Sequence, residues 1–249
     1  MDLSTNENEL AVDESYVAFV AERRAEILNK VGEACQRSGR DLSEVSLFAV
    51  SKTVDVAEVV AAMRAGYENF AENRPQELTR KLAGFEAAGI EAPRFDMIGN
   101  LQKNKINQVL GRASRIQSVS GIELAGAVSS RAERAGLRMP ALLEVNVSGE
   151  ESKGGFTPDE VKAAAEELAG LPGLSLEGLM CMAPAHDEDA ARATFAGGRE
   201  LLEELRRRTG LALPVYSCGM SDDFGIAVEE GSTLVRLGRI VFSPEYQLA

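Results

Sequence analysis

The first chemically distinctive residue is Lys52, which stands two positions beyond the last apolar residue of a predicted strand. Residues 45–50 are mostly apolar without alternation, which is typical of a strand covered on both faces. The segment from Asp55 onward has helical spacing. Lys52 therefore lies between a strand and a helix, where α/β proteins place binding and catalytic groups, and its amine can condense with a carbonyl compound. An ordinary solvated loop lysine is the alternative.

A second group of candidate residues follows the last two predicted strands. It comprises Gly219, Met220 and Ser221 after the strand at 214–217, and Arg236, Gly238 and Arg239 at the end of the strand at 233–237. Glycine lets the backbone approach a ligand closely, and amides at a helix start donate to phosphate oxygens. The group therefore predicts a phosphate site, with Ser221 as an ordinary helix cap as the alternative.

A reactive amine facing a phosphate site suggests pyridoxal 5'-phosphate, held as a Schiff base on Lys52. Arg236 is then placed near the pyridine nitrogen. Arginine stays protonated and only donates hydrogen bonds, so it favours an unprotonated ring nitrogen. The cofactor becomes a weaker electron sink than one paired with an aspartate. Asn73, just past the second predicted strand, is a further candidate contact.

Alternating strands and helices must bring these residues together. The predicted strands are at 45–50, 68–71, 94–98, 115–119, 141–147, 174–180, 214–217 and 233–237. Eight such units in 249 residues predict an α/β fold, a single TIM-type (β/α)8 barrel, whose strand ends converge on one face. A doubly wound sheet is the alternative, but the sequence contains neither G-x-G-x-x-G nor a Walker A motif.

The barrel is expected to carry an additional N-terminal helix at 13–38. Residues 1–12 read as a disordered tail, which leaves 13–249 as the barrel domain. Capping boxes are predicted at 55–58, 120–123 and 157–160, and the helix that starts at the last of these is expected to run to Gly170.

Composition excludes several classes of function. The formal net charge of -12 argues against a nucleic-acid or anionic-membrane partner. No apolar run approaches the roughly 18 residues that a membrane span requires, so a cytoplasmic protein is expected. Three cysteines without C-x-x-C spacing suggest neither a disulfide framework nor a zinc site. The single histidine, His186, leaves little room for histidine-based catalysis or a multi-histidine metal site.

Ordered motifs along nearly the whole chain resemble those of the pyridoxal phosphate homeostasis protein family. They are residues 49–53, 72–73 with 76–77, 98–99 with 101–102 and 104–105, 146–155, 178–180, 219–221, and 231–233 with 235–238. The resemblance implies a barrel similar to the N-terminal domain of alanine racemase, with pyridoxal phosphate on Lys52. It also implies a role in cofactor and amino-acid balance without committed turnover. The implied partners are the cofactor, free amino acids and apoenzymes that require the cofactor, and a monomer is expected.

The sequence departs from this family at three places. Ala71 and Arg74 stand where the family usually has glycine and an aromatic residue, and Phe95-Asp96 replaces a usual Trp-His pair. Arg239 follows Gly238 where the family usually has a small residue, often threonine. Because guanidinium also binds phosphate well, Arg239 is kept among the cofactor-binding candidates.

A pyridoxal-phosphate-dependent amino-acid racemase is the alternative function. Racemisation needs acid/base groups on both faces of the substrate, and Lys52 can serve one face. In alanine racemase the second group is a tyrosine presented by the C-terminal domain and partner subunit, for which this sequence shows no counterpart. The tyrosines here have no evident place opposite Lys52: Tyr16, Tyr67, Tyr216 and Tyr246. A sugar-phosphate barrel enzyme fits the generic barrel but not the motif set.

Overall fold

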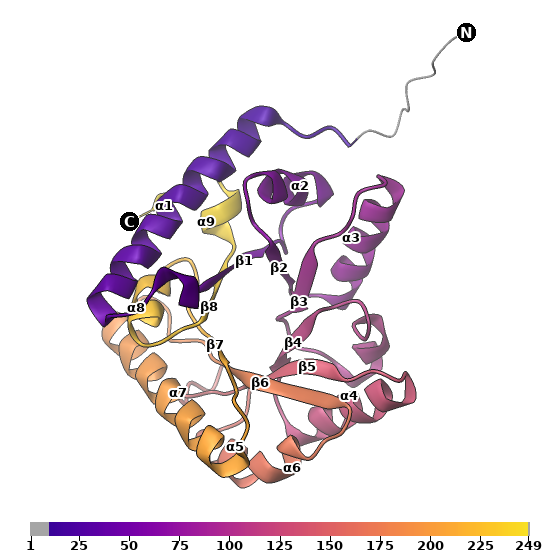
Figure 1. Ribbon diagram of the computed structural model, residues 1–249, viewed down its shortest axis with the longest axis vertical. Coiled ribbons are helices and arrows are strands. Elements are labelled where there is room, and N and C mark those ends of the chain that lie inside the picture. Colours follow the sequence, from indigo (N-terminus) through magenta and orange to yellow (C-terminus); the bar gives the residue numbers. More distant parts are fainter. Residues whose placement is uncertain (1–9, 249) are drawn as a thin grey trace.

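Eight parallel strands close into a barrel in chain order in the computed structural model, which describes residues 10–248 (Figure 1). The closure is direct, because Ala49 of the first strand pairs with Phe70 on the second and with Leu237 on the last. The strands are β1 Ser46–Val50, β2 Asn69–Glu72, β3 Arg94–Met97, β4 Arg115–Val119, β5 Met139–Glu144, β6 Leu174–Met180, β7 Val215–Ser217 and β8 Leu234–Leu237. The predicted α/β TIM-type barrel is confirmed.

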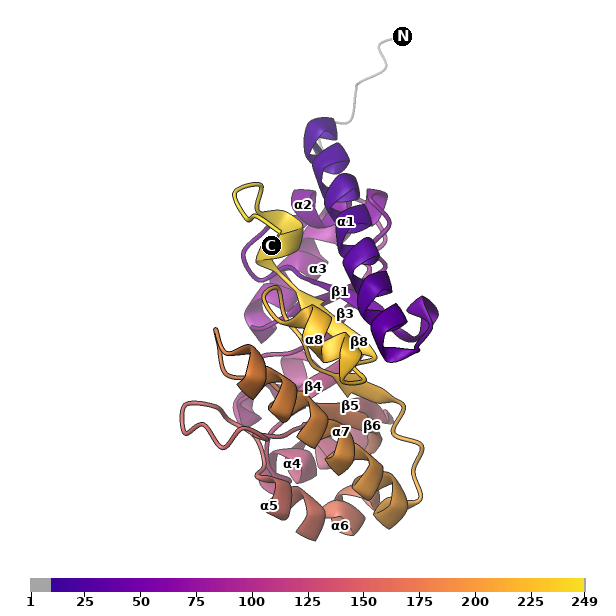
Figure 2. The ribbon, with the colours of Figure 1, turned by 90° about the vertical axis from the view of Figure 1, so that its left-hand side faces the viewer.

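Helices surround the barrel on its outer side (Figure 1). They are α1 Glu14–Ser38, α2 Val56–Arg64, α3 Pro75–Ala87, α4 Ile122–Arg134, α5 Pro158–Ala163, α6 Ala165–Ala169, α7 Glu188–Thr209, α8 Phe224–Glu229 and α9 Arg239–Phe242, with 3-10 turns η1 Leu42–Glu44 and η2 Lys103–Gln108. The predicted N-terminal helix is α1, which starts at the cap residue Asp13 and packs against α2, α8 and α9 (Figure 2). Residues 1–9 of the predicted tail lie outside the described part. Between residues 10 and 248, no helix has the length and apolar character of a membrane span.

Two of the three predicted capping boxes are confirmed. Asp55 and Glu58 start α2, and Thr157 and Glu160 start α5, each pair with reciprocal hydrogen bonds. The prediction at 120–123 is wrong: the cap falls one residue later on Gly121, which has no side chain to accept a hydrogen bond. The single helix predicted up to Gly170 is also wrong, because the backbone at Ala164 separates α5 from α6.

The barrel interior is more polar than the layer between strands and helices. Outside the strands lies a large apolar core in which the Phe95 ring makes tilted contacts with the rings of Phe70 and Phe85. Inside, a small apolar cluster contains Phe48 and Val50. The interiors of such barrels are usually filled by branched apolar side chains. Here Arg236 and Asp96 are also buried, and they are the two ends of a series of hydrogen bonds that crosses the barrel.

Candidate functional site

Lys52 lies in the turn directly after β1, two residues beyond Val50, with its side chain exposed. Val50 pairs with Ala71 of β2, so Lys52 stands at the carboxyl end of the barrel. Within residues 10–248, the Lys52 ammonium has no hydrogen bond or ion pair. An amine without a counter-charge at a barrel mouth is available to a ligand.

The backbone just before Lys52 is fixed by a buried ion pair. Lys81 of α3 and Glu72 at the end of β2 are both fully buried, with Nζ 2.6 Å from Oε1. Lys81 Nζ also donates to the carbonyl oxygen of Ser51 at 3.0 Å. The Ser51 hydroxyl donates to Glu72 Oε1 at 2.6 Å. The residue that precedes Lys52 is therefore held through both its carbonyl and its side chain.

Sequence reasoning missed this ion pair, although α3 contains a signal for it. Leu78, Lys81 and Phe85 are buried on one face of the helix, at the spacing of an apolar stripe. A lysine within such a stripe needs a buried acidic partner, because an isolated buried charge is very costly. The acid at the end of the preceding strand, Glu72, was the candidate.

Asn73 follows β2 and is half-buried at the same end of the barrel as Lys52. The loop after β3 packs tightly against it. A Cβ on Gly99 would lie 2.0 Å from the Asn73 carbonyl oxygen, so only glycine fits there. The Ser118 hydroxyl of β4 donates to the Gly99 carbonyl at 2.6 Å. The loops that follow β2 and β3 are therefore held close together beside Lys52.

The loop after β7 brings Gly219, Met220 and Ser221 to the barrel mouth. Gly219 has a φ of +92°, and a Cβ there would come within 2.6 Å of the Ala227 methyl group. Its carbonyl oxygen accepts from the backbone N–H of Arg236 at 2.9 Å, which joins this loop to β8. Helix α8 begins at Phe224, with Asp223 in the cap position. Ser221 therefore stands in the preceding turn and is not the helix cap.

Gly238 and Arg239 follow β8, the strand that neighbours both β7 and β1. Helix α9, which the sequence did not predict, starts at Arg239. The amides of Val241 and Phe242 donate to the Gly238 carbonyl, which leaves those of Arg239 and Ile240 without an acceptor among the described residues. The Arg239 side chain is 68% exposed and donates to Asp222 Oδ2 at 3.1 Å. Its guanidinium also lies over the Tyr246 ring, 5.6 Å from the ring centre. The Arg239 side chain is therefore held by Asp222 and Tyr246, and the backbone amides at the start of α9 are the better candidates to donate to a phosphate.

Arg236 is buried inside the barrel with only 4% of its surface exposed. Its Nη1 donates to the Ser217 hydroxyl at 2.6 Å, and its Nη2 donates to the Cys181 carbonyl at 3.1 Å. Burial lowers the pKa of the guanidinium, and the nearby carboxylates of Asp223 and Glu144 oppose that change. The side chain is a fixed cation that only donates hydrogen bonds.

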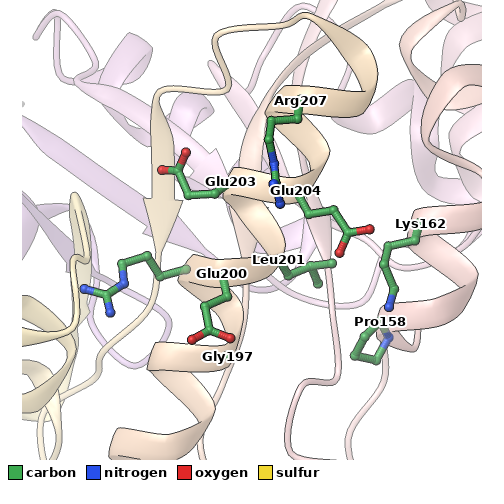
Figure 3. A pocket seen from close by; sticks show the side chains of 9 residues that line it. Pro158, Lys162, Gly197, Glu200, Leu201, Glu203, Glu204 and Arg207 are labelled. Atoms are coloured by element: carbon green, nitrogen blue, oxygen red, sulfur yellow. The ribbon is translucent and has the colours of Figure 1, made fainter.

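A groove on the outer surface lies away from these residues. It has a volume of about 760 Å³ and runs between α5 and α7 on the outer helical layer, where Lys162 and Glu204 face one another (Figure 3). Its lining mixes acidic and basic side chains from two surface helices. The groove is separate from the strand ends that carry Lys52 and Ser221.

Comparison with known proteins decides the family. The model of the alanine racemase N-terminal domain matches residues 28–245. The pyridoxal phosphate homeostasis proteins of Aquifex aeolicus and Pseudomonas aeruginosa are 36% and 38% identical, over 89% and 91% of this chain and 96% of theirs. The chain belongs to the pyridoxal phosphate homeostasis protein family. The resemblance recognised from the motifs is confirmed.

A solved structure of this family agrees in fold. PipY of Synechococcus elongatus PCC7942, determined with PLP bound, superposes with a TM-score of 0.79 at 31% identity. The match covers 90% of this chain and all of that chain (100%). The barrel described here is therefore the fold of PipY, whose structure was determined with PLP bound.

Proposed function

We propose that this chain binds pyridoxal 5'-phosphate and acts in cofactor homeostasis, with Lys52 as the point of covalent attachment. The observation that carries the proposal is the position of Lys52, which has no hydrogen bond or ion pair within residues 10–248, at the same barrel mouth as the loops after β7 and β8. The named function of the relatives and the PLP-bound PipY structure support it. Free amino acids and apoenzymes that require the cofactor are the proposed further partners of a monomeric, cytoplasmic protein.

The residues at the mouth fit the parts of this cofactor. Its phosphate needs several N–H donors. The amides of Ser221, Arg239 and Ile240 have no acceptor among the described residues, whereas the Met220 amide donates to Asp223 Oδ1 at 2.6 Å. Asn73 and Met220 border the same opening from β2 and β7. When bound, pyridoxal phosphate supplies an aldehyde for the lysine amine and an electron-withdrawing ring. Arg236 is the residue that we assign to donate to the ring nitrogen, which keeps that nitrogen unprotonated.

The tyrosines support a binding role without committed turnover. Tyr16 and Tyr216 donate to backbone carbonyls of Phe242 and Phe195, each at 2.7 Å. Burial raises the pKa of Tyr16 and of Tyr246 to about 12. Burial also raises the pKa of Tyr67 and Tyr216 well above the ordinary value. A general acid or base works best with a pKa near the operating pH, so none of the four suits racemisation.

Incubation with amino acids is therefore expected to change the cofactor spectrum without turnover. Transfer of the aldehyde to an external amine needs only Lys52 and an open mouth, whereas racemisation needs a second acid/base group. The measurement follows the visible absorption band and the chiral purity of a panel of L-amino acids together. Racemisation or keto-acid release at about 1–1000 per second, the range of typical enzymes, would favour the racemase alternative.

Replacement of Ser221 by alanine is expected to weaken cofactor affinity about tenfold or more, the effect of losing one hydrogen bond to a charged group. Arg239→Ala should also weaken it, because the change removes a cation and leaves Asp222 without its ion pair beside the phosphate. Equilibrium titration with pyridoxal phosphate measures both effects. Arg208→Ala, a change in an exposed ion pair on α7, is the matched control. Unchanged affinity in both mouth variants would place the phosphate elsewhere.

A further inference from the structure

A chain of hydrogen bonds runs in one direction through the barrel interior, from β8 to β3. Arg236 Nη1 donates to Ser217 Oγ at 2.6 Å. Ser217 Oγ donates to Gln117 Oε1 at 2.7 Å, and Gln117 Nε2 donates to Asp96 Oδ2 at 2.7 Å. Since β4 and β7 are not neighbours, the bond between Gln117 and Ser217 crosses the barrel. All four residues are buried, with at most 4% of their surface exposed.

The direction of this chain is set by its acidic end. An ionised carboxylate can only accept, so Gln117 must turn its amide nitrogen toward Asp96 and its oxygen toward Ser217. The Ser217 proton then points to Gln117, and a lone pair of the hydroxyl is left for Arg236. A protonated Asp96 can donate as well as accept, and the constraint on the other three groups ends. Aligned bonds of this kind also polarise one another.

Asp96 has an environment in which its charge can change near neutral pH. Burial raises the pKa of this carboxyl to about 6, with Arg115 and the hydrogen bond from Gln117 opposing the rise. Arg115 Nη1 lies 3.8 Å from Asp96 Oδ2. The Arg115 Nε is 2.9 Å from Glu177 on β6, an ion pair without hydrogen-bond geometry. These are the charged groups that face Asp96, Arg115 from β4 and Glu177 from β6.

At the other end, Arg236 faces four further titratable groups, the thiols of Cys218 and Cys181 and two carboxyls. The carboxyls are Asp223, before α8, and Glu144, at the end of β5, and burial raises the pKa of each. Neither carboxyl has a hydrogen bond, among the described residues, to the series formed by Arg236, Ser217, Gln117 and Asp96. Asp96 is the one acid joined to Arg236 through continuous hydrogen bonds among the described residues.

We infer that Asp96 is a positioning residue for the cofactor: through Gln117 and Ser217 it fixes the guanidinium of Arg236 and makes cofactor affinity depend on its own ionisation. The inference rests on the proposed function and adds a residue to its site. Ionised Asp96, above about pH 6, is the form that supports binding, and affinity falls as pH drops through that value.

The test is a titration of the purified protein with pyridoxal phosphate between pH 5.5 and 8, followed by visible absorption. Asp96→Asn keeps the shape of the side chain and removes its charge. We expect this variant to bind about tenfold more weakly than the wild type at pH 7.5, the effect of weakening one charge-assisted hydrogen bond. At pH 5.5 most of Asp96 is protonated, so the difference between the two proteins should shrink to about threefold. The ratio of the two affinities cancels the titration of the cofactor's own phosphate.

Two further variants separate positioning from a merely structural role. Gln117→Leu severs the chain with Asp96 in place, so it should reproduce the loss at pH 7.5, and the double variant should lose no more than either single one. If Asp96→Asn does not fold, the loss of affinity at pH 7.5 is tested with Gln117→Leu alone. Glu177→Gln, beside Arg115 but outside the chain, should keep wild-type affinity at pH 7.5.

The outcomes are distinct. Equal affinity of wild type and Asp96→Asn at pH 7.5, or a loss that persists unchanged at pH 5.5, overturns the inference alone. A wild-type protein without a cofactor band at any pH overturns the proposed function itself.

Discussion

Replacement of Lys52 by alanine is expected to abolish covalent retention of pyridoxal phosphate while the barrel stays folded. The side chain is exposed and has no polar partner between residues 10 and 248, so its loss costs little stability. The amine, however, is the proposed attachment point. Borohydride reduction followed by peptide mass mapping should find the pyridoxyl group on Lys52 in the wild type and on no peptide of the variant.

Lys52→Arg is the matched control, because arginine keeps the positive charge but its guanidinium does not form the covalent link. This variant should retain some non-covalent affinity for the cofactor through its phosphate, and it should lose the absorption band of the Schiff base. The pyridoxyl group found only on Lys103, Lys105 or Lys153 would contradict the assignment. Unfolding of both variants at the wild-type temperature is the check that the change is confined to the mouth.

The position of Lys52 was predictable because topology alone determines it. Alternating strands and helices require a parallel sheet, and the ends of parallel strands meet on one face whatever the side-chain details. Lys52, Asn73, Ser221 and Gly238 therefore share the barrel mouth, as the sequence indicated.

Contacts between side chains on distant strands were not predictable in this way. Ser217 and Gln117 are separated by 100 positions, and nothing in their local sequence indicates that they meet inside the barrel. The direction of Arg239 is a second case. Its charge suggests a phosphate contact, which stays a prediction, but its ion pair with Asp222 at the start of α9 could not be foreseen. A short helix of four residues has too little periodicity to be recognised from sequence.

Replacement of Lys81 by methionine is expected to cause the largest loss of stability. The change leaves Glu72 fully buried without its cation, and Glu72 Oε2 already has no hydrogen-bond partner among the residues that the structure describes. Breaking a buried pair from one side costs about 3–5 kcal/mol. For a chain of this size that corresponds to a fall in Tm of roughly 6–20 °C. Urea or thermal unfolding of the protein without added cofactor measures it.

Lys162→Met is the matched control, since Lys162 pairs with a carboxylate of Asp159 that is 93% exposed. A surface pair of this kind contributes about 0–1 kcal/mol, so the control should unfold close to the wild type. Equal free energies of unfolding for Lys81→Met and Lys162→Met would show that the buried pair contributes no more stability than the exposed one.

The double variant Glu72→Leu with Lys81→Met distinguishes stability from positioning. Replacing both partners of a buried pair by apolar residues removes the uncompensated charge and is often close to neutral, so the double variant should regain much of the stability lost by Lys81→Met. It cannot restore the hydrogen bonds to Ser51, which come from Lys81 Nζ and go to Glu72 Oε1. The turn that carries Lys52 is then free to shift. We therefore expect a folded protein with weakened cofactor attachment, and full attachment in the double variant would show that Lys52 needs no support from this pair.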